Sequence, residues 1–290
     1  FNMIEFVGRI VMTPATDNWT RTVIIPGGER RQTGNTARTF TEDILISSEP
    51  DTFMRSRNVQ FQAGGLRPVS RFYPFMDGIS GIDVIPKLIE VSMVSGTFQV
   101  GEVVIGRMPS DDLNIQVSGR SLPAINFLVA QSNHKYGPFD DPTDVFTFNP
   151  YDRTNSIPAT YSASSTTLNV DTASLAGEPT PTKGGYVGAG MRLVGQTSGA
   201  QATISDVELI TDNIGTIIGS YRVPDSQNTA NPTFETGRNR LRLTSSPVNS
   251  KVSGLFSTVA EETFFSQGDI DNSEEVTLSL RNATVTVDTS

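Results

Sequence analysis

Few residues in this chain could support nucleophilic or acid–base catalysis. His134 is the only histidine among 290 residues, and cysteine is absent. A Ser-His-Asp triad needs an imidazole, and His134 lies in the polar stretch 132–137, which we interpret as a surface loop. The string closest to a Gly-x-Ser-x-Gly elbow is Gly195–Gly199, whose spacing is wrong and predicts a turn between strands. Cysteine nucleophiles, disulfides and zinc sites built from cysteine or histidine clusters are therefore excluded.

Two acidic clusters are the candidates for a cation site. Residues 269–274 resemble the start of a calcium-binding loop, but Glu274 stands where that loop needs glycine and Leu280 where it needs glutamate. Irregular cation sites remain open at two places: Asp269, Asp271 and Glu274, and Asp140, Asp141 and Asp144. Carboxylate pairs for glycoside hydrolysis need a separation in space that the sequence does not reveal. We predict no catalytic, cofactor-binding or metal-binding residue, and no enzymatic activity.

Charge is distributed unevenly along the chain. The formal net charge is −9 at pH 7, so we expect neither nucleic acid nor an anionic membrane as a partner. Residues 1–72 contain nine arginines and seven acids, whereas residues 257–290 contain seven acids and one arginine. A basic beginning and an acidic end could meet, within one chain or between copies. The alternative is a solvated surface with chance asymmetry.

Two arginine-rich stretches and one glycine-rich stretch suggest phosphate binding at first sight. Arg30-Arg31 follows two glycines, and Arg55 and Arg57 alternate before Asn58. We favour a structural role, in which alternate arginines project from one face of a strand and pair with carboxylates of a neighbouring strand or subunit. The glycine-rich stretch 184–190 lacks the lysine and the helix of a phosphate loop and predicts a flexible turn.

The elements that must position these residues are strands. Apolar residues alternate with polar ones at 89–93 and 240–244, and Ser95-Gly96 predicts a turn that joins 89–94 and 97–105 as a hairpin. Short strand candidates recur at 23–25, 44–46, 59–61, 167–170, 191–194, 202–209 and 217–221. Helical patterns are restricted to 257–268 and 122–132. The pattern predicts an all-β protein of two, or three, small sandwich or barrel-like modules in series with little helix.

A Pro-, Asp- and Asn-rich stretch suggests the domain boundary. It divides the chain into a first β-rich module at 1–137, with 1–40 as a possible part of a preceding domain, a linker-like loop at 138–158, and a second module at 159–290. The chain begins without methionine and ends in an alternating segment, so we expect an excerpt of a longer polypeptide. Apolar runs stay well short of the roughly 20 residues of a membrane-spanning helix, so we expect no membrane insertion.

Two ordered series of residues carry a resemblance to a known group of proteins. The first series comprises Phe53–Val59, Gly65–Pro68, Arg71–Gly78, Pro86–Glu90 and Gly96–Glu102. The second comprises Gly195–Ala202, Phe234–Arg238, Leu241–Ser246 and Ala260–Phe264. The first resembles a module of large virion structural proteins from contractile-tailed bacteriophages, especially those of cyanobacteria, and the second resembles its usual downstream companion. The resemblance implies a tail, baseplate or fibre component, and carries no catalytic or ligand residues.

Two functions follow as expectations. The first is a non-enzymatic structural component of a phage virion, acting by assembly with copies of itself (three in a fibre, six in a baseplate or tail ring) and with other virion proteins. The alternative is a host-recognition module that binds or cleaves cell-surface carbohydrate, because aromatic side chains in or near loops can stack on sugars. The candidate stacking residues are Trp19, Tyr136, Tyr151, Tyr161 and Tyr186.

Overall fold

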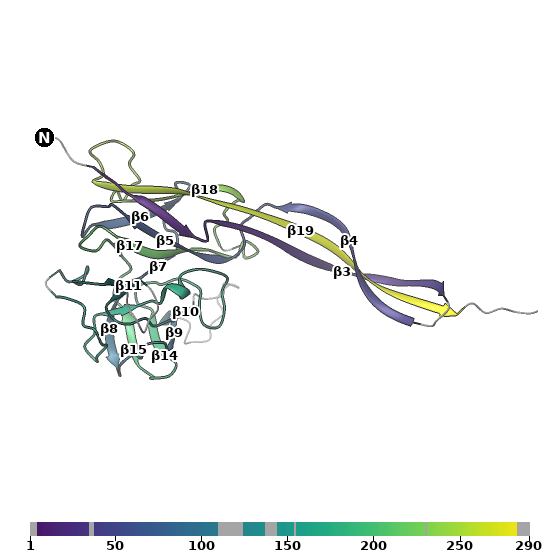
Figure 1. The fold of residues 1–290 in the computed structure, drawn as a ribbon, viewed down its shortest axis with the longest axis horizontal. Coiled ribbons are helices and arrows are strands. Elements are labelled where there is room, and N and C mark those ends of the chain that lie inside the picture. Colours follow the sequence, from purple (N-terminus) through teal and green to yellow (C-terminus); the bar gives the residue numbers. More distant parts are fainter. Residues whose placement is uncertain are drawn as a thin grey trace, which may run out of the picture.

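The computed structural model confirms the predicted all-β class. It describes residues 5–34, 38–109, 124–136, 144–153, 155–229 and 231–282. Within these ranges the chain forms strands and a short 3-10 turn at Thr172–Ser174, with no α-helix. Figure 1 shows three parts, which are a two-sheet body, a curled barrel-like sheet beneath it, and a long arm that projects from the body. No helix long and apolar enough to cross a membrane occurs in the described ranges.

The body is a sandwich of two sheets. One sheet contains β2 (Arg9–Thr13), β5 (Arg57–Gly64), β17 (Ile217–Val223) and β7 (Val84–Pro86). The other contains β1 (Phe6–Val7), β19 (Thr258–Asn282), β18 (Gly237–Thr244), β6 (Arg71–Met76) and β16 (Leu209–Ile210). Val59, Phe61 and Ala63 alternate with glutamines along β5, so that one apolar side meets Leu241 and Phe264 of the facing sheet.

The barrel-like part is a six-stranded sheet. Its strands, in spatial order, are β10 (Ala124–Leu128), β9 (Val103–Arg107), β14 (Arg192–Gly195), β15 (Gln201–Ile204), β8 (Leu88–Ser95) and β13 (Thr167–Asn169). A single bridge between Val129 and Val170 joins the two ends of this order, which nearly closes the sheet around a second apolar core. A small hairpin of β11 (His134–Tyr136) and β12 (Asp144–Val145) lies beside it.

One sheet of the body packs against both cores. In β17, Ile217 and Tyr221 belong to the core of the sandwich, whereas Ile218 belongs to the core of the barrel-like part. In β7, Val84 and Ile85 divide in the same way. Because successive side chains of a strand point to opposite faces, this sheet is buried on both sides and joins the two parts firmly.

The arm is a three-stranded ribbon. It consists of β3 (Thr16–Gly34), β4 (Arg38–Asp51) and the distal part of β19 from about Gly268 onward, with β19 in the middle. β3 runs parallel to β19, and β4 runs antiparallel to it. The 25 residues of β19 first complete the body sheet beside β18 and then continue into the arm, so one strand links the two parts without a joint.

Most predicted strand positions fall on strands, but the candidate at 202–209 divides into β15 and β16, the one at 97–105 begins only at Val103, and the predicted pairing differs. The predicted hairpin at 89–105 is wrong, because β8 lies between β15 and β13 while β9 lies between β10 and β14. The hairpin formed by β14 and β15 is inserted between them. The chain at 96–102 reverses with Phe98 buried in the core, and a local alternating pattern contains no information about which strand will become the neighbour.

The two predicted helices are wrong. Residues 258–268 belong to β19, where Phe264, Ser266 and Gly268 are buried at a period of two. Residues 124–128 form β10, and the first residues of that candidate helix lie outside the described part. Apolar residues three or four positions apart suit a helix, but a pairing partner on each side favours the strand for both segments.

The sheets do not follow the expected division at 138–158. Strands from the first half pair with strands from the second half in each of the three large sheets: β5 with β17, β6 with β18, and β8 with β15. The three parts are therefore not successive in sequence. The Pro-, Asp- and Asn-rich stretch marks a connection between strands, and such a connection need not separate two cores.

Candidate assembly interface: the arm and its base

Apolar side chains are exposed on both faces of the arm. Residues paired across a ladder share a face. On one face, Val23 and Ile25 of β3 lie with Phe40 of β4, and they are 38%, 46% and 46% exposed. On the other face, Ile24 and Leu45 both pair with Ser273 of β19 and are 53% and 57% exposed. A strand ribbon in water normally hides at least one such face, and within the described part of the chain no layer covers these side chains.

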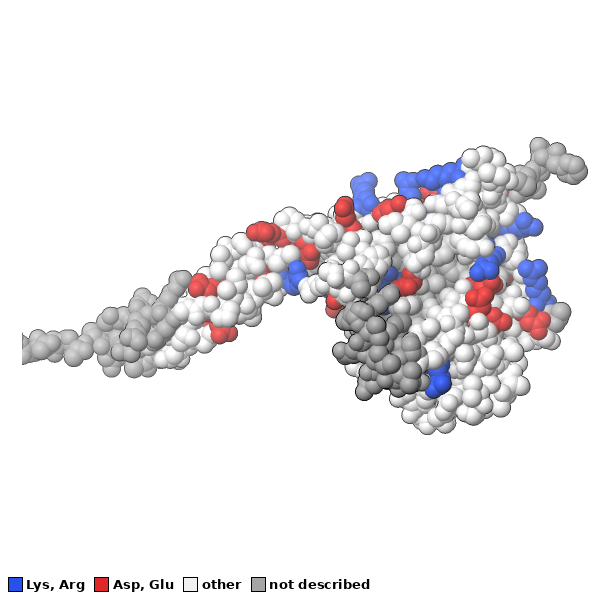
Figure 2. Space-filling model, turned by 180° about the vertical axis from the view of Figure 1, so that it is seen from behind, with Lys and Arg blue, Asp and Glu red and all other residues white. Residues whose placement is uncertain are grey.

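The outer edges of the arm are open as well. β3 and β4 each pair only with β19 in the described part of the chain, so the outer edge of each strand presents unpaired N–H and C=O groups. Long exposed edges are templates for pairing with another chain. The arm also carries carboxylates along its length, visible in red in Figure 2. Open edges, apolar faces and carboxylates together make the arm a candidate interaction surface among the described residues.

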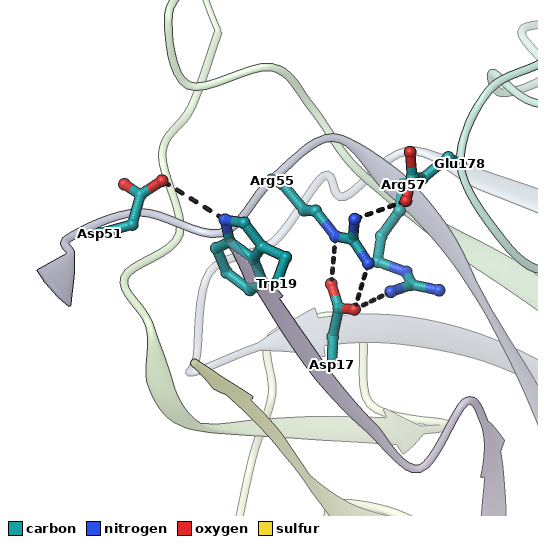
Figure 3. Close-up of polar contacts among 6 residues, drawn as sticks. All are labelled: Asp17, Trp19, Asp51, Arg55, Arg57 and Glu178. Carbon is teal, nitrogen blue, oxygen red and sulfur yellow. Dashed lines mark hydrogen bonds and ion pairs between the residues drawn. The ribbon is translucent and has the colours of Figure 1, made fainter. Parts of the chain in front are cut away.

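A buried ion-pair cluster holds the base of the arm to the body. Figure 3 shows Asp17 of β3 between Arg55 and Arg57, which flank the start of β5. Arg55 donates two hydrogen bonds to Asp17, from Nε to Oδ2 at 3.0 Å and from Nη2 to Oδ1 at 2.8 Å, and a third to Glu178. Arg57 pairs with the same Oδ1 of Asp17. The favoured structural role of Arg55 and Arg57 thus has a geometric basis, whereas the side chains of Arg30 and Arg31 lie outside the described part.

Burial and charge act in opposite directions on Asp17. Its side chain is 4% exposed, and burial by itself raises the pKa of the carboxyl group. The hydrogen bonds and charges of Arg55 and Arg57 outweigh burial and hold this pKa below its ordinary value. Asp17 is therefore a carboxylate at neutral pH, and the cluster pairs its charge with two cations in a nearly dry site.

Trp19 packs beside this cluster at the same junction. Its indole Nε1 donates to Oδ2 of Asp51 at 3.4 Å, and the guanidinium carbon of Arg55 lies 5.5 Å from the centre of the ring. The ring lies against Gly268 of β19, where an added Cβ would be 2.3 Å from Trp19 Cε2. Glycine at 268 thus gives the indole room to bridge the three arm strands where they leave the body.

His134 is not the surface residue predicted from the sequence. It begins β11 and is fully buried, so the polar stretch around it enters the interior rather than forming a loop on the outside. Its neighbour Lys135 is also buried and pairs with Asp212 at 2.9 Å. A hydrophobicity pattern gives no sign of this burial, because ion pairing and hydrogen bonds make it possible.

The turn at 195–199 connects β14 to β15, as predicted. Ser198 Oγ donates to Glu102 Oε1 at 2.8 Å, and the backbone N–H groups of Thr197 and Ser198 donate to Glu102 Oε2. Glu102 is buried and ties this turn to the chain immediately before β9. The serine is therefore held by an acceptor in a structural network, and no imidazole lies beside it in these contacts.

The candidate cation sites do not come together in the described chain. Asp269 and Asp271 share one face of β19 and Glu274 points to the other, because residues an odd number apart alternate across the strand. Asp140 and Asp141 lie outside the described residues. Among the described residues, no group of three or more histidine, aspartate or glutamate side chains is close enough to hold a metal ion.

The loop aromatics are dispersed over different elements. Tyr151 and Tyr161 donate their hydroxyl groups to backbone oxygens of Leu88 and Ala130, and burial raises the pKa of both phenols. Tyr136, Tyr161 and Tyr186 pack against the core of the barrel-like part, whereas Trp19 packs against that of the body. These five residues therefore do not line a common groove.

A small pocket contains two buried lysines that the sequence did not single out. Lys87 Nζ donates to Asn169 Oδ1 at 2.7 Å and to the carbonyl oxygen of Val170, and burial lowers its pKa to about 7. Lys135 lines the same pocket, whose free volume of about 30 Å³ has room for about two water molecules. That space is too small for an organic substrate. The contacts of both lysines, with Asn169 and Val170 for Lys87 and with Asp212 for Lys135, are structural.

Comparison with known proteins adds no relative: no protein family, curated protein or solved structure matches this chain.

Proposed function

We propose that the chain is a non-enzymatic structural component of a phage virion, belonging to a tail, baseplate or fibre, that acts by assembling with copies of itself and with neighbouring virion proteins. The placement in a virion rests on the sequence resemblance of the two ordered series at 53–102 and 195–264. The mode of action rests on one observation, the projecting arm with exposed apolar side chains on both faces.

The arm supports assembly for a thermodynamic reason. Three strands need a second apolar layer to be stable, because backbone pairing alone gives little net free energy in water. Exposed contiguous apolar surface on a soluble protein marks an interface. A neighbouring copy offers the matching layer, and each such contact needs to bury on the order of 1,000 Å² or more to be stable. No comparable geometry favours the carbohydrate alternative, because its candidate aromatic residues are dispersed.

Mass measurement on the purified protein tests the mode of action. We expect wild-type protein to form a discrete oligomer by light scattering after size exclusion. The double substitution Ile24→Lys and Leu45→Lys charges one face of the arm and should lower the association constant at least about tenfold, which is 1.4 kcal/mol. The matched control is Val94→Lys with Ile214→Lys, which are 63% and 62% exposed in the native chain and lie outside the arm.

Two results would overturn the proposal. One is a wild-type chain that remains monomeric at about 100 μM, a concentration at which even weak specific contacts are populated. The other is an arm variant that assembles as well as the control variant. The placement in a virion has its own test, which is antibody labelling of phage particles that carry the protein. Labelling absent from every part of the particle would remove the structural role.

A further inference from the structure

The outer face of the body sheet carries a row of cations that the arm does not use. Arg238, Arg240 and Arg242 alternate along β18 and therefore project from one side, opposite Leu241 and Leu243 in the core. With Lys251 they line a shallow hollow of about 400 Å³, whose carboxylates are Asp77 and Glu261. Figure 2 shows cations in blue along this margin of the body. We call these four cations the arginine face.

The arginine face has unused binding capacity. Arg242 is nearly buried and pairs with Glu261, which also lies 3.6 Å from Nη1 of Arg240. One carboxylate is thus shared by two guanidinium groups, and the Arg240 side chain is 63% exposed. Arg238 is exposed too. Arginine offers a planar fork of donors, so Arg238 and Arg240 can each donate to a further carboxylate in bidentate geometry.

The arm carries the complementary charge at a matching repeat. Asp269, Asp271 and Glu275 lie on one face of β19, and Asp43 of β4 pairs in register with Glu275 on that face. No described cation forms an ion pair with Asp269 or Asp271; Asp271 accepts one hydrogen bond from Ser48. Alternate residues on a strand are about 6.6–6.8 Å apart, so Asp269 and Asp271 have the same spacing as Arg238 and Arg240.

The arm of the same molecule does not make this contact among the described residues. β19 forms part of one continuous sheet with β18 and leaves the body lengthwise, so the carboxylates at 269 and 271 extend away from the arginines. A second copy has no such restriction. Face-to-face association of two acidic arm surfaces brings like charges together, whereas docking of an arm on the arginine face brings opposite charges together.

We propose that the acidic face of one arm, centred on Asp269 and Asp271, docks on the arginine face of a second copy. This inference rests on the proposed function, since it names the partner surface for the assembling arm. The contact is formed by two different patches, so it links copies in a head-to-tail manner or in a reciprocal pair. Ile24 and Leu45 lie on the same arm face and are covered in the same contact.

Charge reversal separates this contact from other modes of assembly. The two test variants are Arg238→Glu with Arg240→Glu, and Asp269→Arg with Asp271→Arg. We expect each to lower the association constant at least about tenfold in 50 mM salt, and by less at high salt. The chain that carries all four substitutions should have an association constant within about threefold of wild type, because the acidic and basic surfaces have exchanged their charges and remain complementary. The matched control is Arg107→Glu with Arg192→Glu, two exposed arginines paired across β9 and β14.

The outcomes distinguish the two proposals. If wild-type protein assembles but both test variants assemble as well as the control, the docking contact is wrong and assembly through the arm stands. If the fourfold variant does not recover although its unfolding midpoint and Trp19 emission are native, the pairing is wrong. If Arg238→Glu with Arg240→Glu assembles normally but loses binding to dextran sulfate, the arginine face binds a polyanion instead. A wild-type monomer overturns both proposals.

Discussion

Asp17 is the residue on which the junction between arm and body depends. It is nearly inaccessible to water, and it accepts from Arg55 and Arg57, of which Arg57 is itself 9% exposed. Breaking a buried pair by removing one partner leaves an uncompensated charge in a low-dielectric site. Asp17 therefore stabilises the fold because its loss would leave a buried arginine charge without a carboxylate. Glu178, which is 59% exposed, contributes much less to stability.

Asp17→Asn is expected to destabilise the protein by about 3 kcal/mol, because Arg57 would keep its charge without a carboxylate. Urea unfolding at pH 7 measures this change. Glu178→Gln is the matched control, with an expected loss under about 0.5 kcal/mol because its ion pair lies in solvent. Equal losses of stability from the two substitutions would contradict the role of Asp17 as the stabilising partner of the buried arginine. Acid should act like Asp17→Asn, because the pKa of Asp17 is lower in the folded chain than in the unfolded chain. The stability that Asp17 contributes is therefore fully present above the unfolded pKa and is lost as the pH falls through the folded pKa.

Lys87 gives the protein a second dependence on pH, of the same sign as that of Asp17 but at higher pH. Burial lowers its pKa to about 7 in the folded chain, against about 10.4 when unfolded. The unfolded chain then binds more protons between these values, so the free energy of unfolding should rise as pH increases from 7 to 10. Above pH 10 it should fall again, because burial raises the pKa values of Tyr151, Tyr161 and Tyr221 and the unfolded phenols lose their protons first.

Lys87→Met should flatten the rise between pH 7 and 10. The substitution should also lower the free energy of unfolding at every pH, since Asn169 Oδ1 loses its hydrogen-bond donor. Urea unfolding at successive pH values measures the slope, and Lys251→Met, at an exposed lysine, is the matched control. A Lys87→Met protein with the wild-type slope would show that another group titrates in this interval.

At the scale of elements, β19 is the strand that joins the parts. Its first residues pair with β18 in the body, and its later residues pair with β3 and β4 in the arm. β19 changes pairing partners near Gly268, where the Trp19 ring occupies the space that a side chain at 268 would fill. The junction at the base of the arm therefore combines the Asp17 ion pairs with this contact between one glycine and one indole.

Gly268→Ala is expected to displace the indole and to cost about 1–3 kcal/mol as an overpacked site. Trp19 is the only tryptophan of the chain, so its emission reports on this junction alone and should shift to longer wavelength as water reaches the ring. The control is Gly28→Ala, in the same strand as Trp19, where an added Cβ meets no atom within 4 Å. Unchanged emission in the Gly268→Ala protein would mean that the indole does not rest on the glycine.

At the scale of the whole molecule, the arm extends far beyond either core. Among the described residues, Val276 is the buried apolar residue in the distal part of β19, whereas the two clusters of core residues lie in the body and the barrel-like part. Contacts to the arm should therefore change assembly more than they change unfolding of the body. The substitutions in the arm, at Ile24 with Leu45 and at Asp269 with Asp271, are therefore expected to alter the mass of the assembly. The urea unfolding midpoint of each variant should stay close to that of wild type.

The sequence by itself determined the all-β class and the positions of most strands. Alternation at 59–63 and 240–244 is a local property, since each side chain is either on the wet or the dry face of its own strand. The absence of cysteine and the single histidine likewise excluded whole classes of sites without any coordinates. The pairing preference of Arg55 and Arg57 for a carboxylate was also readable, although its partner was not.

Only the tertiary structure decided which strands are neighbours. β5 pairs with β17 about 150 residues later, and β19 takes both β3 and β4 as partners, so neither the domain division nor the hairpin at 89–105 could be derived from local patterns. Asp17, Trp19, Gly268 and the arginine face acquire their roles through such distant pairings. Backbone donors and acceptors are available to any strand whatever its side chains, so the choice of partner is made by packing of the whole chain, which no short segment encodes.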